Sequence, residues 1–112
     1  MEDAIPRKPY KVSEQFDAHS TEVYQYTFDT FGYFQAERYR QKIKDAVLSL
    51  PERYLSYPVC RHIPTKSRMY RNIILDAHLI IYRITAKRIE VLDIVHGASS
   101  ISKIQKVRAI RL

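Results

Sequence analysis

Residues 70–96 read YRNIILDAHLIIYRITAKRIEVLDIVH, three runs rich in Ile, Val, Leu and Tyr that two short polar breaks separate. Short runs of β-branched and aromatic residues joined by tight polar connections are typical of antiparallel strands. We therefore expect a meander with strands over 70–75, 79–85 and 89–96. Residues 59–63 are a candidate for a further strand before it.

Two helices are predicted upstream of the meander. The clearer one has apolar residues at spacings of three and four, with Arg and Lys off that stripe, and Pro51 should end it. Its apolar positions are Ala36, Tyr39, Ile43, Ala46, Val47 and Leu50. The preceding helix can be capped by Asp17 or Ser20 and should end at Gly32. Because the connection around Gly32 is short, the helices should form an antiparallel hairpin, with its Tyr and Phe side chains in the core.

The remaining segments complete an α+β fold. Residues 10–16 fit a short N-terminal strand, and residues 1–9 a lead-in without structure. Residues 98–112 form a C-terminal extension with a possible helix that starts near Ser99 or Ser100. We expect one domain over 1–112, in which the hairpin packs on an antiparallel meander of three to four strands. Since the strands are apolar on both faces, the chain itself should cover the face away from the hairpin only in part.

The 112 residues carry a formal net charge of +7, which is divided unevenly. Residues 1–56 hold 8 Lys and Arg against 9 Asp and Glu, whereas residues 57–112 hold 11 against 3. The basic half contains the meander, so the charge lies on a rigid sheet that can attract polyanions. Cys60 is the only cysteine, no signal peptide is recognisable, and no apolar run approaches the roughly 20 residues of a membrane helix. We expect a cytosolic protein that has no intrachain disulfide and does not enter a membrane.

Three strand residues could make a cationic pocket. Arg71, Arg83 and His96 lie one on each predicted strand, and residues two apart share a face, so that His96 should lie with Leu92 and Ile94. If the register brings the three together, two guanidinium groups and an imidazole suit a phosphodiester, with the imidazole exchanging a proton and no metal. Alternatively, the arginines are strand-edge cations and the histidine only ends a strand.

Four further basic residues cluster just before the meander, namely Arg61, His62, Lys66 and Arg68. Such a cluster can contact phosphates, or it can be a solvated charged loop. Cys60 and the histidines lack the spacing of a zinc site, and two glycines in the whole chain leave no phosphate-binding loop. The sequence therefore predicts no metal and no small-molecule cofactor.

Short motifs follow one another in a fixed order after the predicted first strand. Leu50-Pro51 ends the hairpin, and the meander carries YRNI at 70–73, HLIIYRI at 78–84 and IEVLDIVHG at 89–97. Over about residues 10–97 the chain thereby resembles the RelE/ParE toxins of bacterial type II toxin-antitoxin systems. The resemblance implies a small cytosolic toxin, held inactive by a cognate antitoxin that wraps its basic, partly apolar surface.

The resemblance leaves two activities open. RelE and YoeB toxins cut ribosome-bound mRNA without metal. If this chain is such a nuclease, the resemblance implies that His96 is the catalytic acid or base and that Arg71 stabilises the charge of the transition state. ParE toxins inhibit DNA gyrase and are not known as nucleases. Gly97 stands where YoeB-like nucleases carry a tyrosine, and Leu79 where they carry an arginine, whereas His-Gly at this point is familiar in ParE-like sequences.

We therefore expect a ParE-like inhibitor of DNA gyrase, with a ribosome-dependent, metal-independent mRNA endoribonuclease as the alternative. A basic binding module without toxicity is a third hypothesis. For either toxin, the implied RNA- or target-binding residues are Arg61, His62, Lys66, Arg68 and Arg83.

Overall fold

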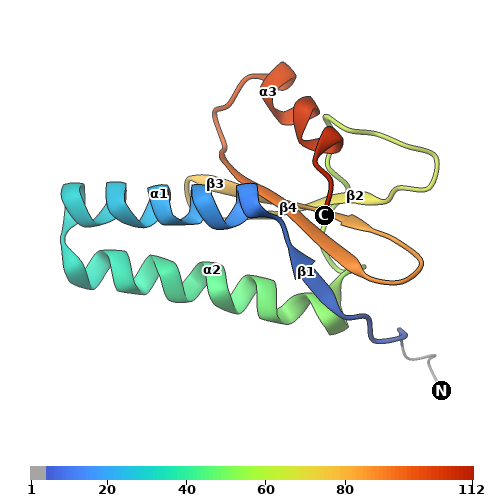
Figure 1. The fold of residues 1–112 in the computed structure, drawn as a ribbon, viewed down its shortest axis with the longest axis horizontal. Coiled ribbons are helices and arrows are strands. Elements are labelled where there is room, and N and C mark those ends of the chain that lie inside the picture. The colour runs from blue at the N-terminus through green and yellow to red at the C-terminus, as the bar shows by residue number, and fades with distance from the viewer. Residues whose placement is uncertain (1–4) are drawn as a thin grey trace.

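Two long helices lie against a four-stranded sheet in the computed structural model, which describes residues 5–112 (Figure 1). In chain order the elements are β1 Tyr10–Val12, α1 Glu14–Phe31, α2 Tyr33–Arg53, β2 Tyr70–Ile74, β3 His78–Ile84, β4 Ile89–His96, α3 Ile101–Gln105 and the 3-10 helix η1 Lys106–Ala109. This is the expected α+β arrangement of a first strand, a helical hairpin, a meander and a C-terminal helix.

The sheet has the order β1-β4-β3-β2, in which β1 runs parallel to β4 and the meander is antiparallel. The N-terminal strand is thus the fourth strand, and the expectation of a strand over 59–63 is wrong. Val59 forms a single bridge to Arg71, after which the chain turns with the Ile63 N–H bonded to the Cys60 carbonyl at 3.1 Å. Cys60 and Ile63 both point into the core, so they anchor a loop instead of alternating as strand residues do.

The hairpin differs from the sequence expectation at both outer ends. Helix α1 begins earlier than Asp17 or Ser20 allow, because the Ser13 hydroxyl accepts the Phe16 N–H at 2.9 Å and caps the helix directly after β1. Helix α2 continues past Pro51 to Arg53. Pro51 lacks a helical N–H, but it is buried and its carbonyl accepts the Lys8 N–H at 3.1 Å, and these contacts offset the loss.

Gly32 alone joins the two helices. It has a positive φ of 92°, a conformation that favours glycine, and its N–H closes α1 by bonding the Phe28 carbonyl at 2.9 Å. The helices therefore lie as antiparallel neighbours, as the short connection predicts.

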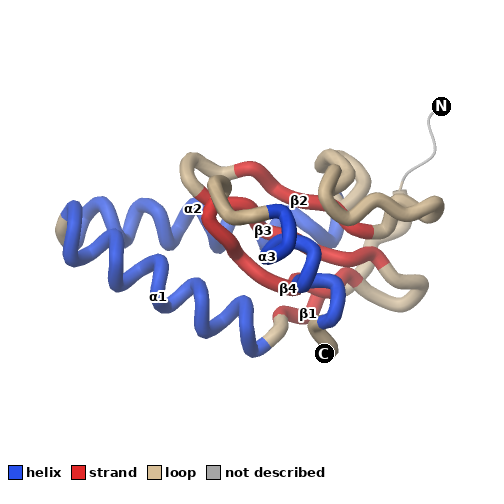
Figure 2. Tube along the Cα trace, turned by 90° about the horizontal axis from the view of Figure 1, so that it is seen from above, coloured by secondary structure: helices blue, strands red, loops and turns tan. Residues whose placement is uncertain are grey.

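Both faces of the sheet are covered by the chain itself, with α3 above and α2 below in Figure 1 and α3 seen over the strands in Figure 2. Hairpin residues that pack on one face are Phe16, Ile43, Val47 and Leu50. The other face is covered by Cys60 and Ile63 of the loop and by Ile104 and Val107 of the tail. The expectation of a partly uncovered sheet is wrong, because the C-terminal extension supplies the missing layer.

The far end of the hairpin projects beyond the sheet, where Gly32 joins its helices (Figure 1). A helix of 21 residues such as α2 spans about 31 Å, longer than the strands beneath it. The aromatic residues near this end are exposed, with Tyr26 and Phe31 at 65% and Phe34 at 82%. They have no sheet to pack on, so the expectation that they belong to the core is wrong.

Candidate functional site

Arg71 lies on the hairpin face of β2, opposite Tyr82 of β3. Its Nη1 donates to the Tyr57 carbonyl at 2.9 Å and the Leu55 carbonyl at 3.3 Å, so the segment after α2 fixes the guanidinium in place. Its Nε is buried and has no hydrogen-bond partner in the described part of the chain. A donor in this state is costly, and an acceptor supplied by a bound group would relieve that cost.

The basic loop before β2 lies next to Arg71. Arg68, in a left-handed conformation with φ 57°, lines with Arg71 a groove of about 460 Å³. Arg61 and Lys66 are exposed, and Arg61 Nε donates to His62 Nε2 at 3.4 Å. We call Arg61, Lys66, Arg68 and Arg71 the basic edge. With His62, five of the seven predicted site residues thus lie on this loop and on the strand that follows it.

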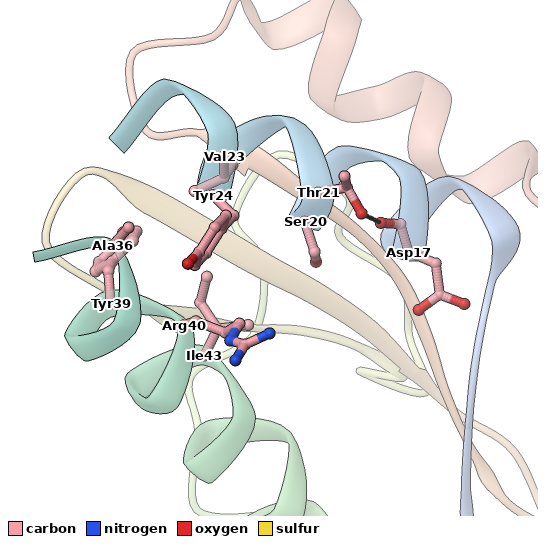
Figure 3. A pocket seen from close by; sticks show the side chains of 9 residues that line it. All are labelled: Asp17, Ser20, Thr21, Val23, Tyr24, Ala36, Tyr39, Arg40 and Ile43. Atoms are coloured by element: carbon pink, nitrogen blue, oxygen red, sulfur yellow. Dashed lines mark hydrogen bonds between the residues drawn. The ribbon is translucent and has the colours of Figure 1, made fainter. Parts of the chain in front are cut away.

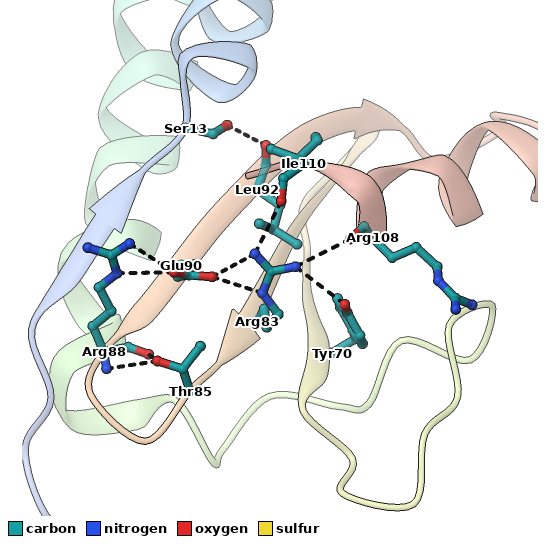
Figure 4. A network of polar contacts seen from close by, with 9 residues as sticks. All are labelled: Ser13, Tyr70, Arg83, Thr85, Arg88, Glu90, Leu92, Arg108 and Ile110. Carbon is teal, nitrogen blue, oxygen red and sulfur yellow. Dashed lines mark hydrogen bonds and ion pairs between the residues drawn. The ribbon is translucent and has the colours of Figure 1, made fainter. Parts of the chain in front are cut away.

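Arg83 is buried on the opposite face of the sheet, where its guanidinium forms hydrogen bonds within the chain (Figure 4). Its Nη2 and Nε donate to Glu90 Oε1 at 2.6 and 2.8 Å, and its other contacts are the Tyr70 hydroxyl and the carbonyls of Arg108 and Ile110. Burial tends to raise the pKa of Glu90, but hydrogen bonds from Arg83 and Arg88 lower it below its ordinary value. Arg83 ties the C-terminal tail to the sheet and is not available at the surface for a target.

His96 lies at the end of β4 beside His78 of β3, with the two ring centroids 5.5 Å apart. Burial, followed by the nearby His96, lowers the pKa of His78. On β3, His78 pairs with His96 and Tyr82 pairs with Arg71. These two positions are four residues apart, so His96 and Arg71 are separated by about 13 Å along the strand direction. Because Arg71 is also held by backbone carbonyls, it does not reach His96.

The predicted cationic pocket of Arg71, Arg83 and His96 is therefore not formed. Arg83 faces the tail, and the other two occupy different ends of the hairpin face. A bulge opposite Ile81 and Tyr82 also breaks the alternation in β4, so that Leu92 packs on the tail side while Ile94 packs on the hairpin side. The predicted common face of His96, Leu92 and Ile94 is therefore wrong for Leu92, whereas His96 and Ile94 lie after the bulge and do share a face.

Sequence reasoning missed a second cluster around His96. His19 of α1 has its Nδ1 at 2.6 Å from the buried Asp93 Oδ1, and the Tyr39 hydroxyl lies 2.7 Å from His78 Nδ1. These partners are separated by 74 and 39 positions in the chain, so no local motif could show them.

A smaller pocket of about 430 Å³ lies between the hairpin helices (Figure 3). The Arg40 guanidinium stands over the Tyr24 ring at 5.2 Å and donates to Glu37 at 2.9 Å, so its charge is already compensated. The Ser20 hydroxyl is buried there without a partner among residues 5–112. The pocket suits water or a small polar group better than an anion.

The fold is that of the RelE/ParE class of toxins. A family model described as "ParE toxin of type II toxin-antitoxin system, parDE" matches residues 10–101, most of the chain. The protein belongs to this ParE toxin family. Membership implies an antitoxin as partner.

Among solved structures, the chain is similar to one from the "Chromosomal ParDE TA system from P. aeruginosa", with a TM-score of 0.66 and 18% identity. The similarity covers 82% of this chain and 98% of the other. At this identity it shows a shared fold. No curated protein sequence matches the chain.

None of the helices in the described residues is long and apolar enough to cross a membrane.

Proposed function

We propose that the protein is a toxin that arrests growth by inhibiting DNA gyrase when it is free of its antitoxin. The observation that carries the proposal is the match to the ParE toxin model over residues 10–101. The His96-Gly97 ending of β4 supports it, because this pair is familiar in ParE-like sequences. The protein acts in the cytosol, where gyrase is found.

The basic edge is the surface that we assign to the target. Arg61, Lys66 and Arg68 are exposed on the loop before β2, and the Arg71 guanidinium, held by backbone carbonyls, shares a groove with Arg68. Fixed charges of one sign steer association with a surface of opposite sign and define its register. The same field attracts an antitoxin that carries acidic residues.

Induction of the chain in bacteria should stop growth and trigger a DNA damage response, and purified chain should inhibit gyrase supercoiling. Arg61→Glu with Lys66→Glu should weaken inhibition about tenfold, since like charges at an interface repel. The control is Lys106→Glu with Arg111→Glu, which changes the net charge equally on the exposed tail. Normal growth on induction, or undiminished supercoiling, rules the proposal out.

The alternative function, cleavage of ribosome-bound mRNA, assigned His96 and Arg71 to a single phosphodiester. Their placement at different ends of the hairpin face does not favour that pair. Mapping mRNA ends after induction tests it, because cuts that vanish in His96→Ala and Arg71→Ala would support a nuclease.

A further inference from the structure

A large cleft lies between α1 and the end of the sheet where His78 and His96 meet. Its volume is about 770 Å³, within the range of about 300–1,000 Å³ that small-molecule sites occupy. His19, His78, His96 and Lys103 supply its nitrogen groups, from α1, β3, β4 and α3. It lies apart from the basic edge.

The three imidazoles are oriented by bonds to their Nδ1 atoms. Asp93 holds Nδ1 of His19, the Tyr39 hydroxyl contacts Nδ1 of His78, and the Ala98 N–H donates to Nδ1 of His96 at 3.0 Å. Because His96 accepts at Nδ1, its neutral ring carries the hydrogen on Nε2 and is a donor there. Each ring therefore has its Nε2 free of these bonds, and His96 offers a hydrogen-bond donor.

Lys103 and Glu22 both line the cleft, so an anion site there rests on Lys103 together with hydrogen bonds from the imidazole nitrogens. Lys103 is exposed and has no acidic partner among the described ion pairs. Of the two carboxylates nearby, Asp93 is buried against His19, and Glu22 is an exposed rim residue 3.7 Å from His19 Nε2. A phosphate group can accept hydrogen bonds from several such nitrogens at once.

Two aromatic rings extend the cleft away from the histidines. Tyr26 and Phe31 line it and remain 65% exposed. Exposed rings stack on nucleobases, at about 1–3 kcal/mol per base. The cleft thus combines an anion site with a platform for a flat aromatic group.

We propose that this cleft binds a nucleoside phosphate, with the phosphate on His78, His96 and Lys103 and the base stacked on Tyr26 or Phe31. The ligand is either a free nucleotide or the phosphorylated end of a single strand. This binding is independent of gyrase inhibition, since the basic edge takes no part in it.

Titration of the purified chain with AMP, adenosine and inorganic phosphate, followed by NMR, tests the site. AMP should shift signals of the cleft and bind about tenfold more tightly than adenosine or phosphate alone, because base and phosphate both contribute. Oligothymidylate with and without a 5′-phosphate separates the sources. A phosphorylated strand that binds more tightly than AMP identifies a strand end, and the reverse order identifies a free nucleotide.

Matched variants locate the binding. Lys103→Ala and Phe31→Ala should each weaken AMP binding about tenfold. Lys87→Ala and Phe34→Ala change the same residue types at exposed positions outside the cleft, and should leave binding unchanged. If Phe31→Ala fails to fold, Phe31→Leu removes the ring and keeps the apolar bulk.

The pH dependence gives a readout that stacking alone would not move. A phosphate favours a protonated imidazole, and burial lowers the pKa of His78 in the free chain, so AMP affinity should rise as pH falls below about 7 toward that pKa. Groups facing the histidine pair are His19 and Glu22 of α1, Tyr39 of α2, Asp93 of β4 and Lys103 of α3, while Asp76 before β3 is paired with Lys42.

Four results would overturn the proposal. They are no shift with AMP, equal affinity for AMP and adenosine, equal losses in the control variants, and tighter binding of polyglutamate than of AMP at the same residues. The last result would assign the cleft to an acidic peptide.

Discussion

Replacing Arg83 by methionine should detach the C-terminal tail and destabilise the whole domain. The change keeps an apolar stem but removes the guanidinium that joins Glu90, the Tyr70 hydroxyl and the carbonyls of Arg108 and Ile110. Breaking a buried ion pair from one side costs about 3–5 kcal/mol. Since Arg88 still neutralises Glu90 through Oε2 at 3.0 Å, we expect the lower end, about 3 kcal/mol.

Chemical denaturation should report this loss, and the melting temperature should fall by about 10–15 °C for a chain of this size. Amide hydrogen exchange should accelerate at Ile104 and Ile110, whose N–H groups are bonded within the tail. Arg108→Met is the matched control, because that side chain is exposed and only its carbonyl joins the network, and it should cost less than about 0.5 kcal/mol. A loss below about 1 kcal/mol for Arg83→Met, with unchanged exchange in the tail, would refute the assigned role.

Three other predictions concern the hairpin and the histidine pair. Ser13→Ala should cost about 1–2 kcal/mol in denaturant unfolding, because it removes the cap of α1 and the hydroxyl bond to the Leu92 carbonyl, whereas the exposed Ser102→Ala should be neutral. Leu50→Ala should cost about 2–5 kcal/mol by the same assay, since Leu50 is fully buried under the sheet, and a loss below about 1 kcal/mol would contradict that packing. The pKa of His78 is lowered in the folded chain, so the unfolded chain binds its proton first and the stabilising effect is lost as pH falls from about 7 through the folded pKa. This part of the pH dependence should disappear in His78→Gln, and its persistence there would assign it to another group.

The meander and the hairpin could be predicted from sequence because their signals are local. The strands over 79–85 and 89–96 lie within one residue of β3 and β4, and the helix expected near Ser100 is capped by that residue. Ser13 was not predicted as a cap because the first strand was expected over residues 10–16, which include it. In the structure β1 ends at Val12 and Ser13 follows directly as the N-cap of α1. The sequence shows aromatic residues on α1, but it does not show that the hairpin extends beyond the sheet and leaves some of them exposed. That depends on how the hairpin is placed in the tertiary structure.

The candidate site was predictable only in part. Arg68 and Arg71 lie three residues apart in the sequence, and they line the same groove in the structure. Their proximity could therefore be expected from their positions. The burial of Arg83 depends on Glu90 across a strand pair and on carbonyls of the tail, and the position of His96 depends on a bulge. Strand register and the packing of the tail decide which side chains meet, and neither can be recognised from the local spacing of residues in the sequence.

The pairing of the first strand with the last has a consequence during synthesis. Tyr10 pairs with Ile89, so β1 has no partner until 89 residues have been translated, about 4–15 s after the strand itself at bacterial rates. An incomplete chain therefore exposes an unpaired strand and an open edge of the sheet. Chains truncated within the meander should be substrates for proteases, and toxicity should appear only with nearly full-length product.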